Sequence, residues 1–128
     1  MNVQVLDAKV YFRAQPFRRP LVLSSGAIRD LAEAVAEVTV EVAGRRATGR
    51  GSIYLSDLWA WPDPAVPHEQ RVAEMVRLCE QIARDLPTLC GPGAGHPLEL
   101  GLRLHEHVCA GDRPPALARA VCASPFDA

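Results

Sequence analysis

Hydrophobic and polar residues alternate along three stretches in the first half of the chain. The apolar positions are Leu6, Ala8, Val10 and Phe12, then Ala34, Ala36, Val38, Val40 and Val42, then Ala47, Gly49, Gly51, Ile53 and Leu55. A period of two predicts half-buried β-strands. A tight turn at residues 43–45 joins the second stretch to the third, so we expect an antiparallel meander with one covered face. Residues 15–28 contain Pro16 and Pro20 and are predicted as a loop.

The second half of the chain changes to a helical period. Apolar residues between His68 and Leu86 recur at spacings of three and four, which predicts an amphipathic helix that Pro87 ends. Two further helices are expected at residues 98–109 and 112–124, the latter with Leu117, Ala120 and Val121 as its apolar side. Strands first and helices second predict an α+β fold in a single domain. A three-stranded antiparallel meander (residues 1–56) is followed by a three-helix subdomain (residues 67–124).

Glycines mark two places where the backbone has unusual freedom. Gly49 and Gly51 on the inner face of the third strand leave room for another backbone or a ligand to come close. They lack the Gly-Lys-Ser/Thr ending of a phosphate-binding loop. Residues 91–95 are predicted to be a flexible connector.

The last five residues, Ser-Pro-Phe-Asp-Ala, have the composition of a helix start. Ser124 would cap it, Pro125 would take the first helical position and Asp127 would place negative charge in the first turn. Because no helix follows, we expect these 128 residues to be the front part of a longer protein.

Composition is that of an ordinary globular protein, with 48% hydrophobic and 23% charged residues and a formal net charge of −1. This charge balance does not favour binding to nucleic acid or to an acidic membrane surface. The first residues lack the pattern of a secretory signal, and the four cysteines form no C-x-x-C pair. We therefore expect reduced thiols and a cytoplasmic protein.

Three groups of residues are candidates for chemistry. His105 and Cys109 lie one helical turn apart, but His107 points away, and a structural zinc needs four ligands. One interpretation of these residues is a metal-binding regulator. The alternative is that they are ordinary packed or solvated positions of a helix. Arg13, Arg18 and Arg19 could grip a substrate carboxylate, or form a solvated edge. Trp59 and Trp61 could cap a ligand or anchor a partner, or pack their loop on the helices.

Several segments together resemble a known family. They are residues 20–26, the hairpin from Val38 to Ser52, the Leu58–Pro62 loop and the tail from Ala120 to Ala128. In these segments the chain resembles the N-terminal capping domain of the enolase superfamily, in its mandelate racemase and muconate-lactonizing branch. The resemblance covers essentially the whole chain.

The resemblance implies that the chain caps a β/α barrel that is absent here. In the full-length family, the barrel holds magnesium and a base removes the proton α to a carboxylate. The parent would be a lyase or isomerase, an acid-sugar dehydratase or a racemase, and this chain alone is expected to be inactive. The resemblance implies substrate contacts at Leu23, Ser24, Ser25, Tyr54 and Trp59, with no catalytic residue and no metal ligand in this chain.

A function of another class stays open. A capping domain without its barrel would expose apolar loops and sheet edges, which promote association. The alternative prediction is therefore a free-standing protein-interaction module that self-associates as a homo-oligomer.

Overall fold

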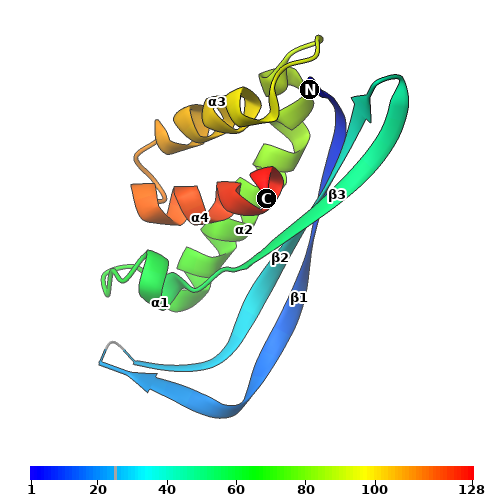
Figure 1. Ribbon diagram of the computed structural model, residues 1–128. Coiled ribbons are helices and arrows are strands. Elements are labelled where there is room, and N and C mark those ends of the chain that lie inside the picture. The colour runs from blue at the N-terminus through cyan, green and yellow to red at the C-terminus, as the bar shows by residue number, and fades with distance from the viewer. Residues whose placement is uncertain (25) are drawn as a thin grey trace.

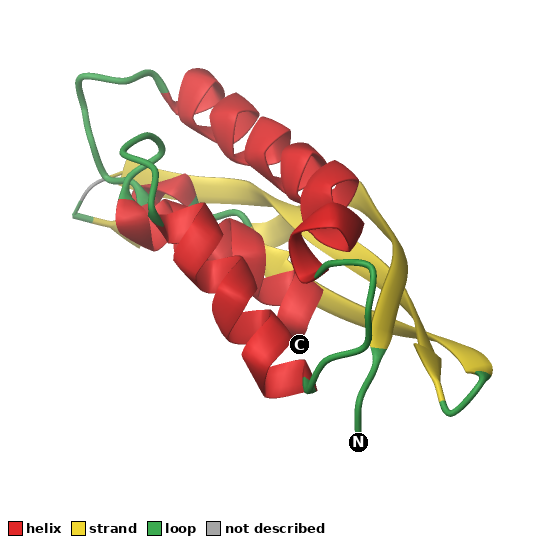
Figure 2. Ribbon diagram, turned by 90° about the horizontal axis from the view of Figure 1, so that it is seen from above, coloured by secondary structure: helices red, strands yellow, loops and turns green. Residues whose placement is uncertain are grey.

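The structure, a computed structural model, describes residues 1–24 and 26–128. Strands β1 (Gln4–Leu23), β2 (Gly26–Val42) and β3 (Arg45–Tyr54) form an antiparallel sheet in the order β1-β2-β3. Helices α1 (Asp57–Ala60), α2 (His68–Cys90), α3 (Pro97–Cys109) and α4 (Ala116–Asp127) follow. Helix α2 packs over β1 and α4 over β3 (Figure 1), and α2, α3 and α4 pack beside one another (Figure 2). The predicted α+β fold, a meander followed by a helical subdomain, is confirmed.

The meander has one covered face, as predicted. Ala34 and Ala36 on the inner face are fully buried. The outer face carries cross-strand pairs: Glu33 with Arg13 and Glu37 with Arg50, both at 2.9 Å. The β2–β3 turn at residues 43–44 has two positive φ angles, 51° and 76°, which suit a tight hairpin of right-handed twist.

The sheet extends further than the sequence pattern indicates. Residues 15–28 were predicted as a loop, and this was wrong: β1 continues to Leu23 and β2 begins at Gly26. Strand β1 is an edge strand, where proline costs no ladder hydrogen bond on its free side. The register also shifts between Pro16 and Leu21, so Pro20 lies in an irregular segment. This part of the hairpin, residues 14–24 and 26–31, is called the hairpin end below; it extends beyond α2–α4 and passes below α1 in Figure 1.

Helix α2 runs through Pro87, so the prediction that Pro87 ends it was wrong. The residues after Pro87 remain helical because Leu89 and Cys90 pack against the core. Arg103 of α3 donates to the Cys90 carbonyl oxygen at 3.1 Å. The helix ends at Gly91, whose φ of +86° a residue with a side chain rarely adopts.

Helix α4 corrects the prediction for the last residues. The helix begins at Ala116 and not at residue 112, and it continues through Ser124 and Pro125 to Asp127. Ser124 does not cap a new helix, since its hydroxyl donates to the Val121 carbonyl oxygen at 2.8 Å within α4. Phe126 is buried, and this packing offsets the hydrogen bond that Pro125 cannot make. Leu117, predicted on the apolar side, is exposed.

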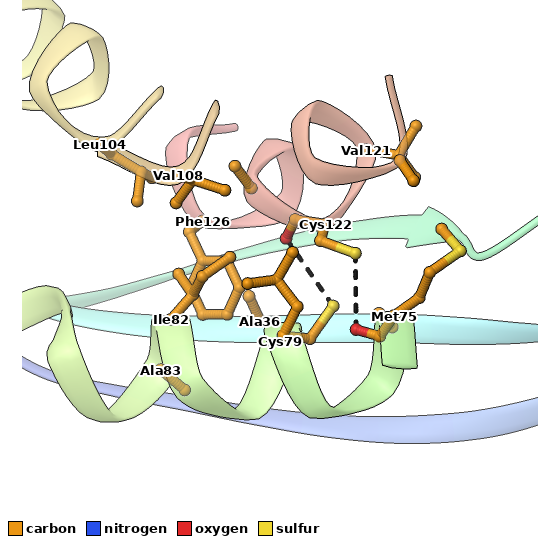
Figure 3. Close-up of a cluster of buried hydrophobic side chains, with 14 of the residues drawn as sticks. Ala36, Met75, Cys79, Ile82, Ala83, Leu104, Val108, Val121, Cys122 and Phe126 are labelled. Carbon is orange, nitrogen blue, oxygen red and sulfur yellow. Dashed lines mark hydrogen bonds between the residues drawn. The ribbon is translucent and has the colours of Figure 1, made fainter. Parts of the chain in front are cut away.

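The core lies between α2, α4 and the inner face of the sheet (Figure 3). Met75 and Cys79 of α2 meet Cys122 and Phe126 of α4 there. The Cys122 thiol donates to the Met75 carbonyl oxygen at 3.5 Å, and the Cys79 thiol to the Cys122 carbonyl oxygen at 3.8 Å. A hydrogen bond with Cys122 and burial both raise the pKa of Cys79, so this thiol is unreactive. All four cysteines are free.

The predicted close approach at the third strand is found at Gly51. A Cβ there would collide with the Pro125 carbonyl oxygen and would lie 2.8 Å from the Ala128 Cβ. Glycine at this position therefore lets the last turn of α4 rest directly on β3. A Cβ at Gly49 would meet no atom of the described residues within 4 Å, and Gly49 borders an apolar cavity of about 250 Å³.

Candidate functional site

The hairpin end and α1 carry most of the predicted substrate-facing residues. Leu23 ends β1, Ser24 begins the turn, and both are exposed; Ser25 lies outside the described residues. Trp59 in α1 is 64% exposed. Tyr54 is half exposed at the end of β3, where it pairs with Glu33 on the face that the helices leave open. The structure thus brings Leu23, Ser24 and Trp59 to one end of the molecule and places Tyr54 on the other face of the sheet.

Helix α1 is the contact between the hairpin end and the helices. It forms within residues 56–67, which were predicted as a loop. A Cβ on Gly26 would lie 3.9 Å from Leu58 of α1, so the start of β2 passes directly beside this helix. Trp59, next to Leu58, is thereby held beside the hairpin end while its ring stays exposed.

Trp61 has the opposite environment. It is 5% exposed and belongs to the core, and the Arg113 guanidinium lies 5.2 Å from its ring centre. Arg113 also donates to both carboxylate oxygens of Glu74, at 2.8 and 2.9 Å, and these hydrogen bonds lower the pKa of Glu74. The sequence allowed either a ligand or partner contact or local packing for the two tryptophans. Trp61 is locally packed, and only Trp59 is placed for a contact at the surface.

A buried charged group lies behind this surface. The Asp57 side chain is 4% exposed and that of Arg71 is 6% exposed. The Arg71 Nε donates to Asp57 Oδ2 at 2.9 Å, and its Nη1 donates to the Asp63 carbonyl oxygen. The His68 Nδ1 lies 2.8 Å from the same Oδ2. The two side chains stabilise the charge of the buried carboxylate and tie α1 to the first turn of α2.

Two hollows meet at this charged group. One, of about 320 Å³, lies between the start of β2 and α1; the other, of about 350 Å³, lies between β1 and the start of α2. Asp30, Leu31, Asp57 and His68 border both. Mostly apolar walls with a few convergent polar groups are typical of small-molecule sites.

Sequence patterns did not point to Asp57, His68 or Arg71. Asp57 lies in a proline-rich segment without periodicity, and charged residues are rarely fully buried unless they are paired. The only available signal was the spacing of His68 and Arg71, which places both side chains on one face at the start of a predicted helix.

Two of the other candidate residues, Arg13 and His105, have structural partners. Arg13 pairs with Glu33 and lies over the Tyr11 ring at 5.6 Å, so it is part of the outer face of the sheet; Arg18 and Arg19 are exposed on the hairpin end. His105 accepts or donates a hydrogen bond with Asp127 at 2.6 Å, which joins α3 to the end of α4.

Neither a metal-binding cluster nor a membrane-spanning helix is found in residues 1–24 and 26–128. These residues contain no group of three or more His, Cys, Asp or Glu side chains placed to hold a metal ion. Within the same residues, every helix is too short or too polar to cross a membrane.

Comparisons with known proteins support the fold. No protein-family model matches the sequence, and no curated protein matches it. The structure is similar to the crystal structure of an enolase from Bradyrhizobium complexed with magnesium and mandelic acid, with a TM-score of 0.59 and 18% identity. The match covers 99% of this chain and 30% of that chain. At this identity the likeness establishes a shared fold, and it spans less than a third of the enolase.

Proposed function

We propose that this chain is the substrate-capping domain of an enolase-superfamily enzyme. It would close over a β/α barrel in which a base removes the proton α to a carboxylate and Mg²⁺ stabilises the resulting negative charge. The structurally similar enolase binds magnesium and mandelic acid, which supports magnesium as the metal and a small carboxylic acid as the substrate. The chain alone would not catalyse the reaction.

The observation that carries the proposal is the exposed end formed by α1 and the hairpin end. Trp59 lies on the short helix α1 with its ring in solvent, and Leu21, Val22 and Leu23 of the hairpin end are exposed as well. Exposed apolar groups at one end of a domain are suited to closing a site and excluding water. Ser24, Ser25 and Tyr54 remain predicted substrate contacts.

The coding sequence after Ala128 gives the first test. If the proposal is right, the same reading frame continues into a barrel. The continuous protein with Mg²⁺ should then exchange the α-proton of a 2-hydroxy acid for deuterium in D₂O, followed by ¹H NMR. An acid-sugar dehydratase would go on to lose water, whereas a racemase would invert the α-carbon. A stop codon directly after Ala128, with no barrel encoded downstream, would refute the proposal.

A matched pair of variants tests the role of the exposed end in that protein. Trp59→Ala should raise KM about tenfold or more with a smaller effect on kcat, because it removes apolar contact with the closed site. Leu102→Ala on α3 removes an equally exposed apolar side chain far from α1 and should leave both constants unchanged.

A free-standing self-associating module is the second candidate, and the same exposed side chains favour it. Leu21 and Val22 are 51% and 78% exposed on an edge strand. Light scattering coupled to size exclusion should then show a homo-oligomer that Val22→Lys dissociates. A monomer at all accessible concentrations would exclude this second function.

A further inference from the structure

His68 has a defined hydrogen-bonding state at the border of the two hollows. Its Nδ1 lies 2.8 Å from Asp57 Oδ2, and the buried Arg71 guanidinium forms an ion pair with the same carboxylate. An ionised carboxylate only accepts hydrogen bonds, so Nδ1 must carry the proton. In the neutral ring, Nε2 is then left as an acceptor with a free lone pair.

The ring is oriented so that Nε2 is available to a ligand. Nε2 lies across the imidazole from Nδ1 and therefore faces away from buried Asp57, and the His68 side chain is 53% exposed. Asp57 is itself held in place, because the almost fully buried Arg71 side chain binds the same Oδ2 through its Nε and Nη2, both at 2.9 Å. Such a carboxylate–histidine pair fixes both the tautomer and the direction of the free nitrogen.

The walls of the hollows indicate the kind of ligand that Nε2 would meet. Arg29 borders the hollow between β2 and α1, and a guanidinium suits a carboxylate. Asp30 borders both hollows and would repel a second carboxylate. Phe12, Leu31 and Val72 supply apolar surface. A monocarboxylate with an apolar part and a hydroxyl group matches these walls.

We propose that His68 is a ligand-binding residue whose Nε2 accepts a hydrogen bond from the hydroxyl of a bound 2-hydroxy acid, while Arg29 pairs with the acid's carboxylate. The choice of a carboxylate ligand rests on the proposed function. The role of His68 does not require the barrel, since every group in the argument belongs to this chain.

The tautomer is tested first, by long-range ¹H–¹⁵N NMR of the 128-residue chain at a pH where His68 is neutral. We expect a protonated Nδ1 and an unprotonated Nε2. A proton on Nε2 would overturn the proposal, because Nε2 could then no longer accept.

Binding is tested with two acids that differ by one hydroxyl, 3-phenyllactate and 3-phenylpropionate. Phenyllactate should shift the His68 Nε2 resonance and bind about tenfold more tightly than its deoxy counterpart, which corresponds to one added hydrogen bond. The ring nitrogens of His107, exposed on α3, should not respond to either acid. Equal responses of Nε2 to both acids would contradict the proposal.

Two substitutions separate ligand binding from a structural role. In His68→Asn the amide can still donate to Asp57 but nothing replaces Nε2, whereas in His68→Gln the amide reaches the Nε2 position and the Asp57 contact is lost. We expect Asn to be the more stable variant and Gln the better binder of phenyllactate, by about tenfold. If Asn binds as well as Gln, His68 has only a structural role.

These results can be told apart from a failure of the proposed function. Selective binding of phenyllactate by the 128-residue chain, together with no proton exchange by the continuous protein, would remove the capping function and keep the site. Proton exchange by the continuous protein with no response of His68 Nε2 to phenyllactate would keep the capping function and remove the His68 site.

Discussion

Strands β1 and β2 run through two parts of the sheet, the part under α2 and α4 and the hairpin end. The side chains of these two parts differ in burial. Under the helices, Ala34 and Ala36 are completely buried. Along the hairpin end, Phe17, Leu21, Val22 and Leu23 are all substantially exposed. Strand pairing alone therefore holds much of the hairpin end together, whereas the rest of the sheet is stabilised by a packed core. A binding surface is more often found on a region such as the hairpin end, which is not tied into the core.

The two tryptophans give the largest expected contrast between these regions. Trp61→Ala should lower the free energy of unfolding by about 3–5 kcal/mol, because it empties a core position and removes the ring beneath Arg113. Trp59→Ala should change it by less than about 0.5 kcal/mol, since that ring is in solvent. Urea unfolding of both variants measures the two changes in the free energy of unfolding. If both variants lost the same amount, α1 would be as tightly packed as the core.

The buried charged group should give the next largest effect. Asp57→Ala leaves the Arg71 guanidinium buried without its carboxylate and should cost about 3 kcal/mol. Arg71→Met leaves the buried Asp57 carboxylate with only the half-exposed His68 as a partner and should cost a similar amount, about 3 kcal/mol.

The double variant is the check on this second prediction. It should lose less than the two single variants added together, because neither charge is then left alone. Additive losses would show that the two side chains do not stabilise each other and that their pairing does not attach α1 to α2.

Two glycines of β3 mark where the packed region ends. Gly51→Ala should destabilise by about 1–3 kcal/mol, because the new methyl group meets the backbone of the last turn of α4. Gly49→Ala, two residues earlier on the same face, should be neutral or stabilise by about 0.5 kcal/mol, since it adds strand propensity next to a cavity. Thermal unfolding of the two variants side by side is the measurement, and equal effects would contradict the packing of α4 on β3.

The sequence pattern was informative where side chains repeat against a core, and uninformative elsewhere. Alternation along β2 and β3 and the helical period of α2 predicted the sheet, the helix and even the close approach at Gly51. Four prolines were wrongly interpreted, Pro16, Pro20, Pro87 and Pro125, because an edge strand or tertiary packing tolerates each of them. The Asp57–Arg71 pair and His68 could not be predicted, since such contacts depend on how α1 meets α2 in three dimensions. The substrate contacts named from resemblance remain predictions.

The Glu74–Arg113 pair should give the smallest effect and a distinct pH dependence. Arg113 lowers the pKa of Glu74 from its ordinary value of 4.5, so the pair stabilises the folded state above about pH 4.5 and this contribution is lost as the pH falls further. Glu74→Gln should lower the urea midpoint by roughly 0.3 M or less at pH 7, because the pair is partly exposed. The difference between wild type and Glu74→Gln should then shrink between pH 5 and pH 3. A difference that stays constant across that range would mean that the charge of Glu74 does not stabilise the fold. The contact with the Trp61 ring would then be what holds Arg113 in place.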